Sequence, residues 1–269
     1  MGLFDVHAHL THPRFAGEQD AVLARARDAG LTSIVCNGLN PKDNAAVLDL
    51  ATRSELVRPA LGLYPVDAVL PEMLALGVDY HRDDPDPPPA GDAAAQWVED
   101  HVEDAFAIGE VGLDHYWVPA ELWDQQEQVF RRLVRLAMAA DKALIIHTRK
   151  AEQRAFEVLV EEGAERVVWH CFSSKVRLGQ RIAEHGHWLS LPANIGKAQN
   201  FQRLAERLPR DKVLLETDCP YLGPERGERN EPANVGVTHR FIAERWGEPA
   251  DAVQRQLEDN YAAVFGEAP

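Results

Sequence analysis

The sequence predicts an α/β protein, a closed (β/α)8 TIM barrel in a single domain that spans residues 1–269. Eight apolar runs alternate with amphipathic stretches, so a helix returns the chain after each strand and the sheet is parallel. A length of 269 residues suits one such barrel. The main alternative, an open doubly wound sheet, usually carries a glycine-rich turn after its first strand, whereas Leu10-Thr-His-Pro-Arg14 stands there.

The predicted elements follow from the apolar pattern in chain order. The strands are expected at Leu3–His9, Thr32–Asn37, Val57–Leu63, Ala105–Gly109, Ala143–His147, Arg166–His170, Trp188–Leu191 and Val213–Glu216. The amphipathic helices are expected at Glu18–Ala29, Ala45–Thr52, Ala94–Glu103, Leu122–Ala140, Ala151–Glu162, Val176–Glu184, Ala198–Arg207 and Gly236–Trp246. A last helix, Asp251–Val264, would close the bottom or the flank of the barrel.

One acidic, proline-rich segment interrupts this alternation. It reads His81-Arg-Asp-Asp-Pro-Asp-Pro-Pro-Pro-Ala-Gly91. Proline cannot continue a helix or a central strand. We therefore expect a surface insertion at about residues 81–93, between the third and fourth strands.

Composition limits the class of protein. The net charge is −15, from 43 acidic and 28 basic residues, which argues against a broad basic face that coats nucleic acid or an anionic membrane but allows a local grip on phosphates. The three cysteines form no paired framework, and no apolar run reaches the roughly 18 residues that span a bilayer. We expect an unprocessed cytoplasmic protein, a monomer with no membrane contact and no obligate protein partner.

Two histidines in the first predicted strand are spaced to share an ion. Strand side chains alternate, so Asp5, His7 and His9 share one face, and the Cα atoms of the two histidines lie roughly 7 Å apart. This pair alone is equally consistent with core histidines held by hydrogen bonds. His185-Gly-His187 has the same spacing but precedes its strand, so we expect it at the opposite rim with no ion.

Polar side chains recur where the predicted strands end, the rim that carries the chemistry of such barrels. They are His7, His9, Glu110, His147, His170 and Asp218. Four imidazoles and two carboxylates at one rim suit a divalent ion, or two.

Several motifs in order resemble the TatD family of metal-dependent deoxyribonucleases, a branch of the amidohydrolase-like superfamily. They are Asp5-Val-His-Ala-His9, Gly109-Glu-Val-Gly-Leu-Asp114, Ile145-Ile-His-Thr-Arg149, His170-Cys-Phe-Ser173, Glu216-Thr-Asp-Cys-Pro-Tyr-Leu222, Asn230-Glu-Pro-Ala-Asn234 and Glu258-Asp-Asn260. The resemblance covers nearly the whole chain. It implies a two-metal site in which His7, His9, Glu110 and Asp218 hold one ion. Glu110, His147 and His170 hold the other, with Glu110 as the bridge that a carbamylated lysine provides in related amidohydrolases.

Further roles are expected around these ligands. Asp218 would orient or deprotonate the attacking water, which makes Asp218 and Glu110 the predicted catalytic residues. Asp5 and Glu216 would orient the ligands from behind, or make only structural hydrogen bonds.

The predicted substrate-binding residues are Arg149, a bidentate phosphate clamp, with Tyr64, Ser173 and Lys175. Tyr64 stands where the family often has histidine, and would donate to a phosphate or stack on a base. Ser173 is equally suited to cap the following helix. Ser174 replaces the usual glycine of its turn.

These features predict a divalent-metal-dependent hydrolase of DNA phosphodiesters, with RNA as a second substrate, acting as a 3′→5′ exonuclease at nucleic-acid ends. Mg²⁺ or Mn²⁺ would support activity, and imidazoles would retain Zn²⁺. Two alternatives stay open: a metallohydrolase of a small amide, lactone or phosphoester, and a metal-binding partner module that has lost catalysis.

Overall fold

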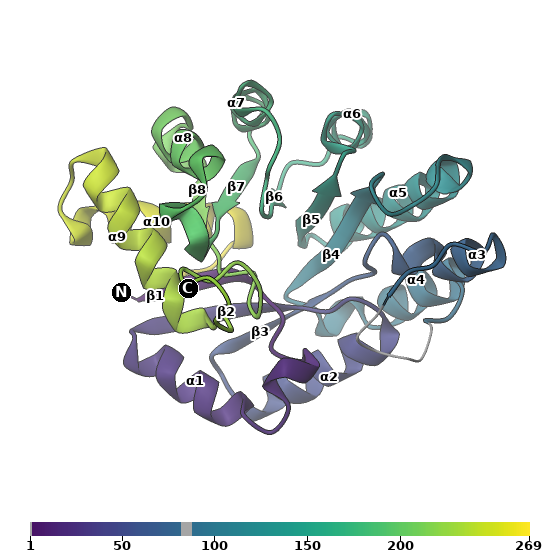
Figure 1. Ribbon diagram of the computed structural model, residues 1–269, viewed down its shortest axis with the longest axis horizontal. Coiled ribbons are helices and arrows are strands. Elements are labelled where there is room, and N and C mark those ends of the chain that lie inside the picture. Colours follow the sequence, from purple (N-terminus) through teal and green to yellow (C-terminus); the bar gives the residue numbers. More distant parts are fainter. Residues whose placement is uncertain (1, 82–87) are drawn as a thin grey trace.

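Eight parallel strands form a nearly closed barrel surrounded by helices (Figure 1). The computed structural model describes residues 2–81 and 88–269. The strands are β1 (Leu3–Ala8), β2 (Leu31–Asn37), β3 (Val57–Leu61), β4 (Ala107–Asp114), β5 (Ala143–Arg149), β6 (Val167–Trp169), β7 (Trp188–Leu191) and β8 (Val213–Leu215). Each pairs in parallel with its neighbour in the chain. The predicted barrel fold is thereby confirmed.

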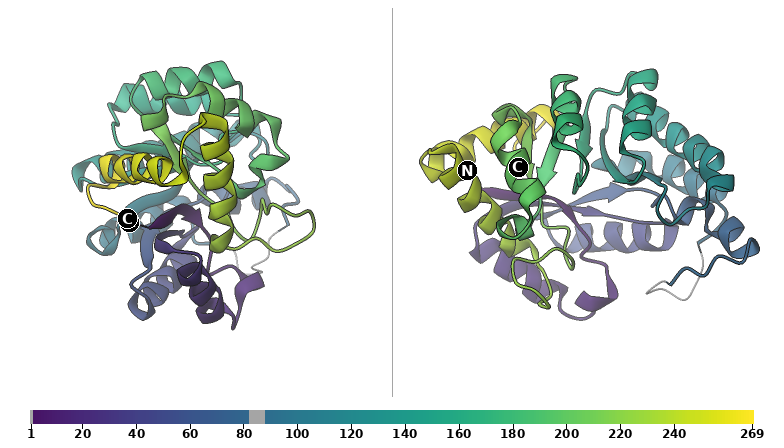
Figure 2. Two further views of the ribbon diagram at one scale, coloured as in Figure 1. Left: turned by 90° about the vertical axis from the view of Figure 1, so that its left-hand side faces the viewer. Right: turned by 45° about the horizontal axis from the view of Figure 1, so that its top comes forward.

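The helices lie outside the strands in both views of Figure 2. They are α1 (Gln19–Asp28), α2 (Pro41–Arg53), α3 (Leu70–Ala75), α4 (Gly91–Asp100), α5 (Trp123–Ala139), α6 (Glu152–Glu162), α7 (Val176–Glu184), α8 (Gln199–Arg207), α9 (Val235–Trp246) and α10 (Ala250–Phe265). Within residues 2–81 and 88–269, no helix combines the length and the apolar character needed to cross a membrane.

Two helices differ from the predicted pattern. Helix α3 was not predicted, because its buried anchors, Leu70 and Met73, are too few to establish a period. Helix α4 begins at Gly91, inside the predicted insertion, where the backbone approaches the Ala68 carbonyl so closely that a Cβ would clash with it. Residues 82–87 of the predicted insertion lie outside the described residues.

Strand β4 continues five residues beyond its predicted end at Gly109, to Asp114. Gly109 and Gly112 are poor strand formers in isolation, but both are needed because β5 lies so close. A Cβ on Gly109 would lie 2.7 Å from the Ile145 Cβ, and one on Gly112 would clash with the His147 carbonyl. The register also shifts between Ile108 and Val111, which adds one residue to β4 opposite β5. Such a bulge re-aims side chains, and it contains Glu110.

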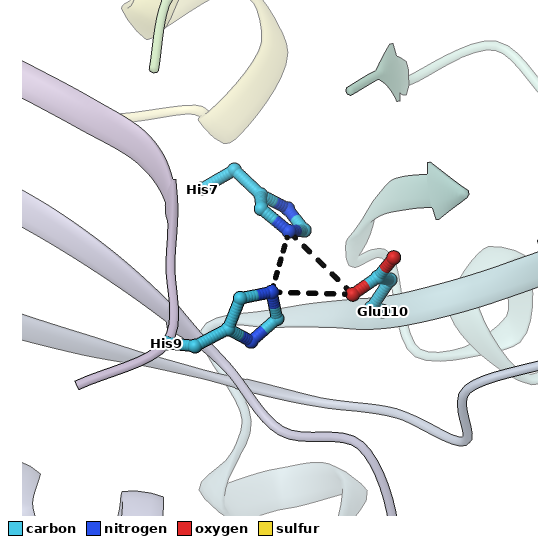
Figure 3. A group of neighbouring side chains, drawn as sticks. All are labelled: His7, His9 and Glu110. Carbon is cyan, nitrogen blue, oxygen red and sulfur yellow. Dashed lines mark hydrogen bonds and ion pairs between the residues drawn. The ribbon is translucent and has the colours of Figure 1, made fainter. Parts of the chain in front are cut away.

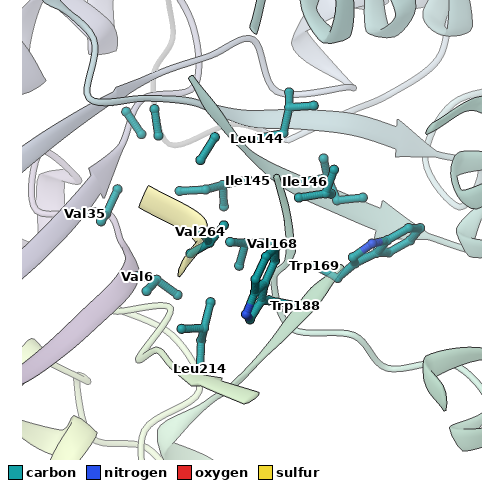
Figure 4. Packing of buried hydrophobic residues seen from close by; sticks show 14 of the residues in the cluster. Val6, Val35, Leu144, Ile145, Ile146, Val168, Trp169, Trp188, Leu214 and Val264 are labelled. Atoms are coloured by element: carbon teal, nitrogen blue, oxygen red, sulfur yellow. The ribbon is translucent and has the colours of Figure 1, made fainter. Parts of the chain in front are cut away.

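The apolar core fills the barrel and continues beneath the surrounding helices. Figure 4 shows Val6, Val35 and Leu214, which come from different strands, gathered close to Val264 of α10. Tyr261 of α10 donates to or accepts from the Ser33 hydroxyl at 2.8 Å, and its ring lies 4.9 Å from that of Phe4. Helix α10 therefore packs at the ends where β1 and β2 begin, opposite the rim predicted to carry the chemistry.

The barrel closes between β1 and β8 through only a few contacts, which we call the seam. No ladder is formed there by the described strands; an isolated bridge joins Ala8 to Cys219. The Asp218 amide donates to the His7 carbonyl at 2.8 Å, and the His9 amide donates to the Cys219 carbonyl at 2.9 Å. The Asp5 carboxylate spans the seam by accepting from the Thr217 amide at 2.9 Å.

His187 lies in the core at the beginning of β7, as its place before that strand predicted. Its Nδ1 accepts from the Trp169 indole at 3.1 Å, which leaves Nε2 to donate to the Ala164 carbonyl at 2.9 Å. Both ring nitrogens are thus used by a neutral imidazole. Burial lowers the pKa of His187 to about 4.

We expect this histidine to make the folded protein sensitive to acid. In the unfolded state the imidazole of His187 binds a proton below a pKa of 6.5, whereas in the folded state it binds one only below about 4. The stability that this neutral histidine contributes is therefore fully present above pH 6.5 and is lost as the pH falls from 6.5 to 4. The loss is roughly 3 kcal/mol. Chemical denaturation from pH 7 to pH 4 measures it, and His187→Gln should flatten this part of the profile. Equal pH slopes in both proteins would contradict the assignment.

Candidate metal centre

The six predicted ligands come from five strands or the turns that follow them. His7 lies in β1 and His9 directly after it, while Glu110 lies at the bulge of β4. His147 lies in β5 and His170 directly after β6. Asp218, three residues after β8, has a φ of 55°, a left-handed backbone that turns the chain at the seam. The structure brings all six side chains together.

A first group of donor atoms forms where β1 faces β4 and the seam. His7 Nε2 lies 3.1 Å from His9 Nε2, and these atoms lie 3.5 and 3.4 Å from Glu110 Oε2 (Figure 3). Asp218 Oδ1 is 3.6 Å from each imidazole nitrogen. Four atoms from distant parts of the chain therefore face one point.

A second group uses the other oxygen of the same glutamate. Glu110 Oε1 lies 2.8 Å from His147 Nδ1 and 3.1 Å from His170 Nε2, and these nitrogens are 3.3 Å apart. The two groups are adjacent, because the rings of His7 and His170 stack with centroids 3.7 Å apart. Glu110 is the residue that both groups share.

The spacing of these atoms fits small divalent cations. Ligand atoms that lie about 2.0–2.2 Å from a tetrahedral ion are roughly 3.3–3.6 Å from one another. Most separations in both groups fall in or near this range. Three overlapping sets of these residues have donor atoms that all lie within 4.8 Å of one another. His7, His9, Glu110 and His170 are also at least 94 % buried, so water screens their charges weakly.

The electrostatics of the centre also favour a cation. Burial alone would raise the pKa of Glu110. The three neighbouring imidazoles of His170, His147 and His7 outweigh this effect and lower that pKa well below its usual value. Burial opposes protonation of His9, yet Asp218 and Glu110 raise its pKa to about 9. The carboxylates therefore hold positive charge in this buried place, and a divalent cation would take over the role of those protons.

The two residues predicted behind the ligands make different contacts. Asp5 accepts from the His7 amide at 3.1 Å and from Thr217, so it orients the backbone at the seam. Glu216 accepts from the Cys171 amide at 2.8 Å and the Ser190 hydroxyl at 2.6 Å, and its Oε2 lies 3.8 Å from His170 Nδ1. Burial raises the pKa of Asp5 to about 8 and that of Glu216 to about 7.

Asp114 is a site residue to which the sequence analysis gave no role. Its Oδ2 lies 3.4 Å from His147 Nε2, and its Oδ1 accepts from the Tyr116 and Trp117 amides at 2.8 and 2.9 Å. It thus fixes the ring that supplies Nδ1 to the second donor group. The signal was present, since Asp114 ends one of the quoted motifs, but the predicted strand stopped at Gly109.

An open cavity of about 720 Å³ lies above the centre. Two predicted substrate-binding residues line it. The Tyr64 ring is 5.0 Å from that of His147, and the Arg149 guanidinium lies 3.8 Å from the centre of the Tyr116 ring. Burial raises the pKa of Tyr64 well above its usual value, so its hydroxyl stays a donor. A polar wall completes the cavity, formed by residues that include Asn40, Lys42, Asp43 and Asp67.

The other two predicted substrate-binding residues are placed differently. Ser173 is exposed in the turn before α7, and the N-terminal cap of α7 is Lys175, not a serine. Lys175 lines a separate depression beside the cavity. The structure therefore brings Tyr64 and Arg149 to the ligands and leaves Ser173 and Lys175 outside the cavity lining.

Comparison with known proteins gives consistent relatives. The TatD related DNase family matches residues 4–266. The human protein named "Deoxyribonuclease TATDN3" is 30% identical over 98% of this chain and 95% of its own length. A Shigella flexneri protein named "3'-5' ssDNA/RNA exonuclease TatD" is 28% identical over 98% of this chain and 99% of its own length. "Uncharacterized metal-dependent hydrolase YabD" of Bacillus subtilis is 31% identical, with 90% of each chain covered.

A solved structure shares the whole architecture. The crystal structure of YjjV, a TatD homologue from Escherichia coli K12, superposes with a TM-score of 0.83. The match covers 98% of both chains at 26% identity.

Proposed function

This chain belongs to the TatD related DNase family, a family of hydrolases, and on that premise we propose that it is a 3′→5′ exonuclease that cleaves phosphodiester bonds of DNA and RNA. One observation carries the proposal. The oxygens of Glu110 face two separate donor groups at the floor of an open cavity, the arrangement expected of a centre for two divalent cations.

The donor set fits Mg²⁺ or Mn²⁺ as the active ions and Zn²⁺ as a tightly held one. Such cations, when bound, would neutralise charge on a phosphodiester and lower the pKa of a water molecule. His7, His9, Glu110 and Asp218 would hold one. Glu110, His147 and His170 would hold the other.

Asp218 would act as the base. Its side chain is 14 % exposed, against 0 and 7 % for the neighbouring His7 and His9, so an oxygen is reachable from the cavity. Burial opposes its ionisation, but His9 and other nearby imidazoles lower the pKa of Asp218. A carboxylate is thus present at neutral pH to orient a water and accept its proton.

Other side chains bind and orient the substrate. Arg149 can pair with non-bridging phosphate oxygens while its guanidinium stays stacked on Tyr116. The Tyr64 hydroxyl would donate a further hydrogen bond. Asp114 keeps the His147 ring in register, and Asp5 keeps β1 and the Asp218 turn together.

We also propose that the protein acts as a one-domain monomer in the cytoplasm. All six proposed ligands come from one chain, so no second copy is needed to complete the centre. The three cysteines are free, which suits a reducing compartment.

The test is cleavage of single-stranded DNA and RNA labelled at the 5′ end, with Mg²⁺ or Mn²⁺ and after chelation. We expect stepwise shortening from the 3′ end, loss of cleavage on chelation, and recovery when metal is restored. Asp218→Ala should lower the rate at least about 10³-fold, since it loses both a ligand and the base.

Cleavage that survives chelation or Asp218→Ala would contradict the proposal. A panel of small amides, lactones and phosphoesters distinguishes the nuclease from the alternative, a small-molecule metallohydrolase. That enzyme would hydrolyse a member of the panel and would cleave no oligonucleotide. Full metal occupancy without turnover of any substrate would indicate a binding module.

A further inference from the structure

A second hollow of about 800 Å³ lies at the rim of the barrel beside the metal centre. It runs between the N-terminal halves of α6 and α7, which are neighbours in Figure 1. Five of the residues that line it are basic and two are acidic: Lys150, Arg154, Lys175, Arg177 and Arg181, against Glu152 and Glu157. This local excess of positive charge contrasts with a net charge of −15 for the whole chain. We call this hollow the basic groove.

Most cations of the basic groove have no carboxylate partner. Arg154 is paired with Glu127 at 2.7 Å. Within the part of the chain that the structure describes, no carboxylate lies within 4.0 Å of the charged group of Lys150, Lys175, Arg177 or Arg181. All four residues are exposed. Four unpaired cations along one hollow form a surface suited to a polyanion.

The arginines of the neighbouring helix α5 differ from these cations, because each of them pairs with a carboxylate. Arg131 and Arg135 are both matched with Glu162 at 2.7 Å, and Arg132 with Glu99 at 2.7 Å. The arginines of α5 are thus held by carboxylates of the protein itself, unlike the four cations of the basic groove. Lys150 also has a φ of 61°, a conformation that glycine or asparagine adopts at lower cost. The geometry of the turn therefore does not explain why a lysine stands at position 150.

The basic groove and the metal-centre cavity meet at consecutive residues. Arg149 lines the cavity and Lys150 lines the basic groove. Over this edge lie Tyr116 and Trp117, which are 51 and 41 % exposed, with the Arg149 guanidinium 3.8 and 5.6 Å from their ring centres. Exposed rings beside cations are how single-stranded nucleic acid is held without base-specific hydrogen bonds.

We propose that the basic groove binds the sugar–phosphate backbone of a single strand several nucleotides upstream of the bond being cleaved. This inference rests on the proposed nuclease function and adds to it a binding surface for the part of the strand that is not being cleaved. The terminal nucleotide occupies the cavity, a base stacks at Tyr116 and Trp117, and the preceding phosphates follow the cations between α6 and α7. Longer single strands are then better substrates than dinucleotides.

The test compares the intact metal-loaded protein with Lys175→Ala/Arg177→Ala. The first measurement is the salt dependence of the Kd for a labelled eight-nucleotide strand. Its linkages are phosphorothioates, so that the strand stays intact while it binds. Each phosphate contact contributes about 0.7 to the salt slope for a single strand, so the double variant should lose about 1.4 and bind roughly 25-fold more weakly at 0.1 M salt. The second is the ratio of kcat/KM for the eight-nucleotide strand to that for a dinucleotide, which should fall about as much.

Two further variants make the test specific. Arg203→Ala/Arg255→Ala removes the same charge from exposed positions on α8 and α10, and should bind like the parent. Lys150→Gly removes a groove cation at a left-handed backbone position that glycine adopts without strain, and its salt slope should fall by about 0.7.

The outcomes separate this proposal from the nuclease function. If dinucleotides are cleaved but the groove variants keep the parent's Kd and kcat/KM ratio, the basic groove is wrong and the function stands. If nothing is cleaved while the groove variants bind the strand more weakly, the groove stands without the nuclease. Displacement of the strand by polyglutamate of equal total charge would overturn the assignment to nucleic acid.

Discussion

Glu110→Gln is expected to lower kcat for phosphodiester cleavage by at least about 10³-fold and to leave less than one tightly held metal ion per chain. The amide keeps the shape of the side chain but loses the charge that both donor groups share. It also turns an NH₂ group toward imidazole nitrogens that now lie 2.8–3.5 Å from the carboxylate. Single-turnover kinetics and metal analysis by mass spectrometry measure the two effects.

Two comparisons isolate the role of the shared carboxylate. Glu103→Gln makes the same change at an exposed position seven residues earlier and should leave both kinetics and metal content at the parent values. Glu110→Asp keeps the negative charge but has a shorter side chain, so its carboxylate should reach one donor group better than the other. Metal binding should then be weakened more at one group than at the other. A Glu110→Gln protein with normal turnover and metal content would remove Glu110 from the centre.

Asp5→Ala is expected to cause the largest loss of stability, about 3–5 kcal/mol. Its carboxyl accepts from the His7 and Thr217 amides at 3.1 and 2.9 Å, so truncation leaves two buried N–H groups without an acceptor at the weakly paired seam. Asp5→Asn should cost only about 1 kcal/mol, because burial raises the pKa of Asp5 to about 8 and a neutral side chain already fits at pH 7. Denaturant titration of the metal-loaded protein at pH 7 measures both changes.

The control for this stability effect is Asp104→Ala, which removes an exposed carboxylate and should change the free energy of unfolding by less than about 0.5 kcal/mol. A loss below about 1 kcal/mol for Asp5→Ala would show that the backbone bonds between His7 and Asp218, and between His9 and Cys219, close the barrel without it.

The fold was predictable because the apolar alternation is strong. Each strand is buried on both faces, so its run of Val, Ile and Leu stands out, and the helix that follows is amphipathic. The prediction failed where local composition and tertiary contact disagree. Gly109 and Gly112 weaken β4 as an isolated strand, yet the close approach of Ile145 and His147 requires them. Helix α3 is too short to show a period.

The convergence of the six proposed ligands was also predictable, because parallel strands deliver their ends to one rim. Their role as metal ligands stays a prediction. The division of Glu110 between two donor groups came from the family resemblance, since the one-residue bulge that aims its side chain leaves no local pattern. Asp114 was missed with the end of β4. Lys175 lines the second hollow and not the metal-centre cavity, because a strand end does not show on which side of α7 a long side chain will lie; its role in substrate binding stays a prediction.

The seam has a consequence for synthesis on the ribosome. His7 and His9 emerge among the first residues, whereas Asp218 and Thr217, which hold them in place, are added more than two hundred residues later. A nascent or prematurely terminated chain therefore carries the imidazoles without the carboxylate that completes their group. The four donor atoms of the first group can therefore come together only after Asp218 has been added to the chain.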